Sequence, residues 1–170
     1  MNKKLIGVII VATVALSACG AKKADTASSS DSTATATEAP AATGGFGSAL
    51  DLGGGIALTL SAPQSFVPGS FATNYLKGQA ANIFDVTVKN GGTTPLDTTS
   101  IVIQTGSGEN TCTDVLDGDN GITGAPTDPI AAGAEVSFKF AIACDAKSGD
   151  PLNVSVSVGA TSASIDGKIA

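Results

Sequence analysis

The sequence predicts an all-β domain of two antiparallel sheets packed face to face, preceded by a disordered tether. After about residue 46, apolar and polar residues alternate with a period of two in several short segments, which is the pattern of half-buried strands. Turn residues such as Asn90-Gly91-Gly92 separate these segments. No stretch after the tether shows the spacing of an amphipathic helix, so the strands must bury their apolar faces against each other.

Residues 1–18 have the layout of an export signal. Lys3 and Lys4 are followed by an apolar stretch of 12 residues, which is too short to span a bilayer at about 20 residues. The stretch ends in Leu16-Ser17-Ala18-Cys19, which resembles the lipobox of bacterial lipoprotein signal peptides. The resemblance implies that peptide 1–18 is removed and that Cys19 carries a diacylglycerol. An ordinary secretory signal with a stray cysteine, or an uncleaved anchor, is the alternative.

Lipidation at Cys19 would place the protein on the outer face of the cell membrane, anchored and not spanning. Two acyl chains hold a protein at a membrane where one lets it leave. Loss of Lys3 and Lys4 changes the formal net charge from −6 to −8, which anionic headgroups repel. We therefore expect the N-terminal diacylglycerol to be the membrane contact.

Residues 19–45 are predicted to be the lipidated cysteine and a disordered linker. Residues 21–43 are mostly Ala, Ser and Thr, with no apolar side chain larger than Ala, so they bury too little surface to offset the entropy of ordering. The Thr residues around Pro40 are also candidate sites for O-linked sugars, but a plain linker is the favoured interpretation.

Residues 46–170 form the predicted sandwich domain, with four clear strands and a shorter fifth. We expect the strand around residues 84–88 to face the strand around residues 136–142 across the sandwich, with Phe138 in the core. The alternating apolar positions are Ile56, Leu58 and Leu60; Phe84, Val86 and Val88; Ile101 and Ile103; Val136, Phe138, Phe140 and Ile142; and Leu152, Val154, Val156 and Val158.

Two segments, NIFDVTVKNGGTTPL at residues 82–96 and PIAAGAEVSFKF at residues 129–140, carry a family resemblance. The first ends a strand in an Asn-Gly turn, and the second leads through Pro-x-x-x-Gly into another apolar strand. Over residues 56–158 the chain resembles the immunoglobulin-like domain of Gram-positive extracellular lipoproteins and secreted antigens. The resemblance implies an immunoglobulin-like antiparallel β-sandwich at the cell surface and no particular site residues. The core Trp of antibody domains is missing.

Cys112 and Cys144 are left as an even pair once Cys19 is assigned to lipid. In an exported domain this parity favours a disulfide. A catalytic or redox cysteine would need a C-x-x-C spacing or a nearby His, and the sequence has neither.

The densest polar feature is an acidic loop containing Asp114, Asp117 and Asp119, with Asp128 a short distance beyond. Loops rich in oxygen ligands and Gly bind calcium in some proteins. The EF-hand pattern fails here, because Gly121 occupies the fifth position counted from Asp117. We expect a solvated turn that is a weak cation site at most, and no assigned metal ligand.

Composition argues against several function classes. The chain has no His and no Arg, so it lacks the usual general base near neutral pH and the usual reader of phosphate groups. We therefore expect no enzyme activity, no cofactor and no nucleic-acid binding. The predicted function is a lipid-anchored cell-surface module with a non-catalytic interaction or envelope-structural role and an unknown protein or envelope partner. The alternative is a surface lipoprotein that binds a small ligand or a metal.

Overall fold

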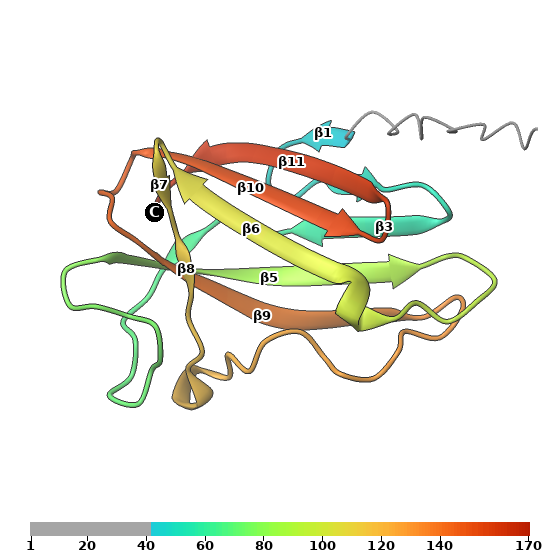
Figure 1. Ribbon diagram of the computed structural model, residues 1–170, viewed down its shortest axis with the longest axis horizontal. Helices are drawn as coiled ribbons and strands as arrows, with labels where there is room; N and C mark the ends of the chain where they lie inside the picture. The colour runs from blue at the N-terminus through green and yellow to red at the C-terminus, as the bar shows by residue number, and fades with distance from the viewer. Residues whose placement is uncertain (1–41) are drawn as a thin grey trace, which may run out of the picture. The chain divides into compact units, whose positions relative to one another are not determined.

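The computed structural model describes residues 42–170, which fold into two β-sheets packed face to face (Figure 1). Sheet A has the strand order β1-β11-β10-β6-β7, and sheet B has the order β2-β3-β5-β9-β8, with β4 also paired to β5. The strands are β1 Ala42–Gly44, β2 Ala49–Asp51, β3 Ile56–Leu60, β4 Gln64–Ser65, β5 Ala80–Asn90, β6 Ile101–Ser107, β7 Asn110–Thr111, β8 Thr113–Asp114, β9 Glu135–Cys144, β10 Pro151–Val158 and β11 Thr161–Lys168. Two short 3₁₀ turns, η1 Thr98–Ser100 and η2 Gly118–Asn120, complete the regular elements.

The order of the strands is immunoglobulin-like. In that fold, strands A, B, E and D form one sheet and strands C, F and G form the other. In this protein the sheet that corresponds to strands A, B, E and D contains, in that order, β3, β5, β9 and β8. The sheet that corresponds to strands C, F and G contains β6, β10 and β11. Strand β1 pairs in parallel with β11, while the other pairs are antiparallel. The predicted fold class, an immunoglobulin-like antiparallel β-sandwich, is confirmed.

The core lies between the two sheets and is built from the alternating apolar positions. Phe84 is at its centre, with its ring 5.7 Å from that of Phe46 and 6.3 Å from that of Phe140. Leu58 from sheet B and Val154 from sheet A are fully buried. Each such side chain contributes about 1.5–3 kcal/mol by leaving water, so an aliphatic core with few aromatic rings is enough for a domain of this size.

The expected packing of the residue 84–88 strand across from the residue 136–142 strand is wrong. Strands β5 and β9 are neighbours in sheet B, with Phe84 beside Phe140 and Val86 beside Phe138. Their common buried face packs against sheet A instead. Alternation with a period of two marks which face of a strand is buried, but it carries no information about which sheet the strand joins. Phe138 is half-buried, because it lies where the sandwich opens toward β6.

The ordered domain begins before residue 46. Ala42 to Gly44 form β1, which pairs with Ala163 to Ile165 of β11, although residues 42–45 were predicted to belong to the linker. An edge strand is held by backbone hydrogen bonds, so it needs no large apolar side chain to mark it. Residues 1–18, Cys19 and the linker up to residue 41 lie outside the described residues.

Two loops pack together on the outer face of sheet B, and both lie on the same side of β9 (Figure 1). We call residues 66–76 and 115–122 the loop lobe. A second small core holds the lobe to the sheet. It consists of Val115, Ile122, Ala141 and Ala143, with Phe66, Ala72, Tyr75 and Ile83 packed around them.

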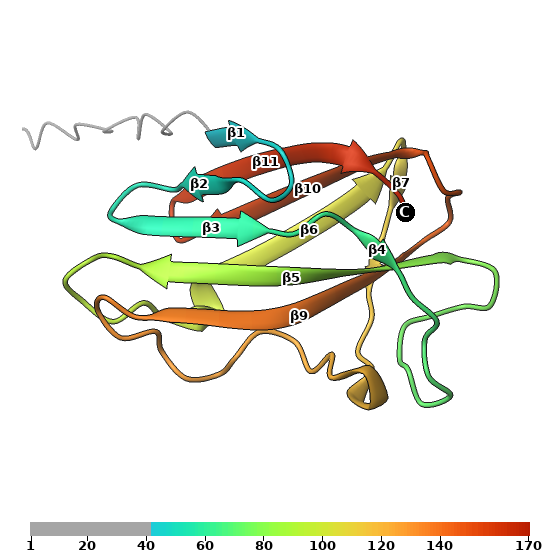
Figure 2. The ribbon, with the colours of Figure 1, turned by 180° about the vertical axis from the view of Figure 1, so that it is seen from behind.

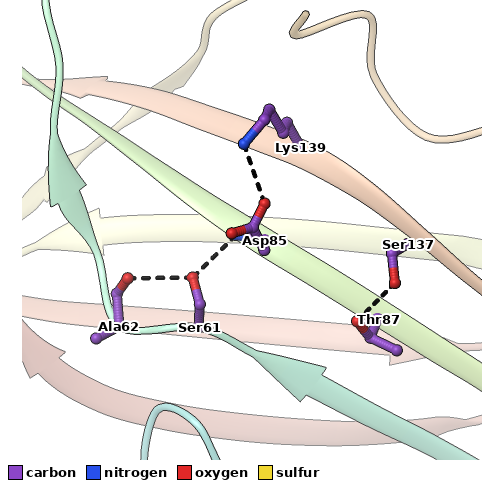
Figure 3. A network of polar contacts seen from close by, with 6 residues as sticks. All are labelled: Ser61, Ala62, Asp85, Thr87, Ser137 and Lys139. Atoms are coloured by element: carbon purple, nitrogen blue, oxygen red, sulfur yellow. Dashed lines mark hydrogen bonds and ion pairs between the residues drawn. The ribbon is translucent and has the colours of Figure 1, made fainter.

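The rest of the outer face of sheet B is polar. Strands β3 and β5 lie next to each other in the view from behind (Figure 2). Across β5 and β9, Lys139 forms a 3.2 Å ion pair with Asp85, and the hydroxyls of Thr87 and Ser137 are 2.8 Å apart (Figure 3). Exposed ion pairs of this kind contribute about 0–1 kcal/mol. Within residues 42–170 there is no helix of the length and apolarity needed to cross a membrane.

Candidate binding surface

The structure contains the predicted disulfide between Cys112 and Cys144. Cys112 lies between β7 and β8, where the chain passes from sheet A to sheet B, and Cys144 ends β9. Both residues are buried. The bond therefore ties the crossover to the core strand β9 and holds the segment that leads into the loop lobe.

The four acidic residues of the predicted loop do not form one cluster. Asp117 and Asp119 lie together beside Gly69. Asp114 belongs to β8, and Asp128 is exposed in the following loop. Within the described part of the chain, no group of three or more acidic, His or Cys side chains is placed to hold a metal ion. A site built from all four carboxylates is therefore not formed.

Asp117 is the one buried carboxylate of the four, with 1% of its surface exposed. Its Oδ2 atom accepts hydrogen bonds from the backbone N–H of Gly69 and from Asn120 Nδ2, each 2.7 Å long. These two donors, the Gly69 N–H first, hold the pKa of Asp117 below its usual value. Its backbone exchanges two hydrogen bonds with Ile122, of 2.9 and 2.8 Å, which closes the turn that contains η2.

The two halves of the lobe run side by side. Besides the contact of Gly69 with Asp117, the backbone N–H of Thr73 donates to the Leu116 carbonyl at 2.9 Å. Asn74 Nδ2 donates to the Asp114 carbonyl at 3.1 Å. Residues 69–74 are thus aligned in antiparallel fashion with residues 114–117, and the loop that carries Phe71 has a defined position.

The lobe presents an apolar surface to solvent. Val67 is 86% exposed, Phe71 85%, Leu76 71% and Leu116 46%. We call these four residues the apolar loop surface. The one other large apolar side chain of residues 42–170 with comparable exposure is Val102, on β6. This surface was not among the predicted features. Its signal in the sequence is a set of large apolar residues at 66, 67, 71 and 76 that follows neither strand nor helix periodicity.

A narrow apolar cavity of about 160 Å³ lies where the sandwich opens. Ile101, Ile103 and Phe138 line it, with Asp114 and Lys139 as its charged groups. Partial desolvation of the Asp114 carboxyl raises its pKa. Pockets for small molecules usually measure about 300–1,000 Å³, so this cavity is small for an organic ligand.

A wider open groove of about 720 Å³ runs along β6, β7 and β10. Its lining combines polar residues such as Gln104, Thr111 and Asn153 with the apolar residues Ile103 and Cys112, and Asp114 is its single charged residue. No aromatic ring lines it, so a sugar would find no stacking platform. The cavity is smaller than the usual small-molecule site, and the groove lacks the predominantly apolar and aromatic lining of such sites.

Comparisons with known proteins give a likeness of fold. The lipoprotein candidate YcdA of Bacillus subtilis has a crystal structure that matches with a TM-score of 0.57 at 14% sequence identity, covering 70% of this chain and 38% of that one. The chain therefore spans well under half the length of YcdA. A β-sandwich protein from Clostridium difficile matches with a TM-score of 0.46 at 14% identity, covering 76% of this chain and 95% of that one. No family model and no curated protein matches the sequence.

Proposed function

We propose that this chain is a lipid-anchored immunoglobulin-like module on the outer face of the cell membrane, with a non-catalytic role in which the apolar loop surface binds another protein. The observation that carries the proposal is the exposure of Val67, Phe71 and Leu76. They protrude from loops that hydrogen bonds hold in place. Three large apolar side chains exposed within ten residues of one loop fit an interaction site better than single scattered ones do.

Charge favours a protein partner over a membrane surface or a nucleic acid. Residues 42–170 carry five Lys, no Arg and twelve Asp or Glu, and the loop lobe contains Asp117 and Asp119 with no Lys. Anionic lipids and phosphate backbones are repelled by such a surface. A partner with an apolar patch bordered by Lys or Arg is complementary to it.

A catalytic role has little support in the chain. It has no His, and the buried carboxylate Asp117 already accepts two hydrogen bonds from its own loops. The alternative, a surface lipoprotein for a small ligand, would have to use the open groove along β6, β7 and β10, which has one charged residue and no aromatic ring in its lining, because the apolar cavity beside Phe138 is too small.

Site-specific crosslinking in the native cells tests the binding surface. A photo-crosslinking phenylalanine analogue at Phe71 should give an adduct with a second protein, and the same analogue at Val102 should give none. In parallel, Val67→Ser with Phe71→Ser should lower capture of that protein by more than tenfold, while Val102→Ser leaves it unchanged. Equal adducts at both positions, no adduct at either, or an adduct with a second copy of this chain would each contradict the proposal.

A separate experiment tests the anchor, since Cys19 lies outside the described residues. Cys19→Ala should abolish labelling by a fatty-acid analogue and leave unprocessed precursor. When signal residues 1–18 are also removed from this variant by an independent route, the chain should leave the membrane fraction. Ser17→Ala, which keeps a small residue in the lipobox, is the matched control and should be labelled normally. Labelling of the Cys19→Ala chain would rule out lipidation at this residue.

A further inference from the structure

Two carboxylates of the loop lobe converge on one glycine. A Cβ atom placed on Gly69 would lie 3.1 Å from Asp117 Oδ1 and 3.1 Å from Asp119 Oδ2. The absence of a side chain at Gly69 thus leaves a small hollow to which both oxygens are adjacent. Gly69 belongs to one half of the lobe and the two Asp residues to the other, so the hollow lies between the two loops.

One of these oxygens is buried with no partner. Asp117 Oδ1 has no hydrogen-bond donor, although the residue is 99% buried and its other oxygen has two donors. Buried polar atoms are nearly always paired, and a buried ionised oxygen without a partner is costly. Among residues 42–170 the one ion pair is Lys139 with Asp85, so no lysine neutralises this carboxylate.

We propose that Asp117 Oδ1 and Asp119 bind a calcium ion beside Gly69, with water in the remaining positions. Calcium takes oxygen ligands in flexible geometry, and extracellular sites with few carboxylates bind it with Kd values of about 10⁻⁴–10⁻³ M. Magnesium demands near-ideal octahedral geometry and gives up its water reluctantly, so it fits two converging carboxylates less well. The site uses two of the four acidic residues that the sequence singles out and excludes Asp114 and Asp128.

Both ligands belong to residues 115–122, so the ion would fix the turn that contains η2. The other half of the lobe contacts this carboxylate through the Gly69 N–H, which donates to Asp117 Oδ2, and it supplies no ligand to the ion. Calcium binding and protein binding are independent proposals, because either holds without the other, and the first is tested with the metal alone.

Calorimetry and thermal unfolding of the chain from residue 20, with calcium chloride or magnesium chloride, test the site. Calcium should bind one ion with a Kd of about 10⁻⁴–10⁻³ M. At 10 mM it should raise Tm by about 5–10 °C, since it binds the folded state alone. Magnesium should give less than a third of that shift.

Substitutions locate the ion. Asp119→Asn, an exposed position, should weaken calcium binding at least tenfold, and Gly69→Ala should do the same by filling the hollow. Asp128→Asn removes one carboxylate from a nearby loop outside the lobe and should leave Kd unchanged. No heat and no Tm shift in the parent chain, an equal response to magnesium, or equal weakening by Asp128→Asn and Asp119→Asn would overturn the proposal.

Discussion

The side-chain amide of Asn90 donates a 2.8 Å hydrogen bond to the backbone carbonyl of Ile130, 40 residues further along the chain. The same nitrogen donates to the Thr94 carbonyl at 2.8 Å, and Asn90 Oδ1 accepts from the Gly92 N–H at 3.0 Å. Asn90 is almost fully buried. It therefore joins the turn after β5 to the Pro-Ile segment that leads into β9, which are the two segments that carry the family resemblance. In this protein those motifs stabilise the fold.

We expect Asn90→Ala to destabilise the domain by about 2–4 kcal/mol, because it leaves the Ile130 and Thr94 carbonyls and the Gly92 N–H without their buried partner. Urea unfolding, monitored by circular dichroism, measures this loss of stability. Asn110→Ala is the matched control: its one side-chain bond, to the Asp145 carbonyl, is exposed and 3.4 Å long, so the loss should be under about 0.5 kcal/mol. Similar losses at the two positions would contradict the structural role of Asn90.

Phe84→Ala should cost about 3–5 kcal/mol of unfolding free energy, because it opens a cavity at the centre of the core. Phe138→Ala should cost about 1–2 kcal/mol, since Phe138 is half-buried. Lys139→Ala should cost under about 0.5 kcal/mol, as its ion pair is exposed. Denaturant titration of the three variants ranks their losses of unfolding free energy. A larger loss at Phe138 than at Phe84 would mean that β9 is placed wrongly.

Replacing Cys112 and Cys144 together by Ala should lower the stability by about 2–4 kcal/mol, as expected for a loop closed over a separation of 32 residues. Mass spectrometry of the exported, non-reduced chain should first show the loss of two hydrogens relative to the reduced chain. The double variant and the reduced parent should then unfold at similar urea concentrations. Two free thiols in the exported chain would disprove the bond.

Asp117→Asn should be less stable than the parent chain at pH 7, and the difference should shrink as the pH falls. The folded-state pKa of Asp117 is lowered, so its stabilising contribution is present above the unfolded pKa of about 3.9 and is lost as the pH falls through the lower folded value. Unfolding in EDTA between pH 7 and pH 2.5 measures this without calcium. Asp128→Asn is the control for removal of one charge. A difference that stays constant down to pH 2.5 would mean that the carboxylate charge is not responsible.

The strands and the disulfide could be predicted from the sequence. Alternation over Phe84 to Val88 and over Leu152 to Val158 reports which face of each strand is buried, because side chains on a strand point alternately to opposite faces. Parity of the remaining cysteines pointed to the bond between Cys112 and Cys144. Each of these signals is local or is a matter of counting, so it needs no knowledge of which strands are neighbours.

Tertiary structure alone decided which elements meet. Whether β9 lies beside β5 or across from it leaves the alternation of both strands unchanged, since the same face is buried in either case. The contact between Gly69 and Asp117 joins residues 48 apart, and no periodicity relates two irregular loops. The pairing of Asp117 with Asp119 at Gly69, and the exposure of Val67 and Phe71, follow from how those loops pack on Ala141 and Ala143. Side-chain pattern thus determined the faces of the strands, and long-range packing determined the surface on which function is proposed.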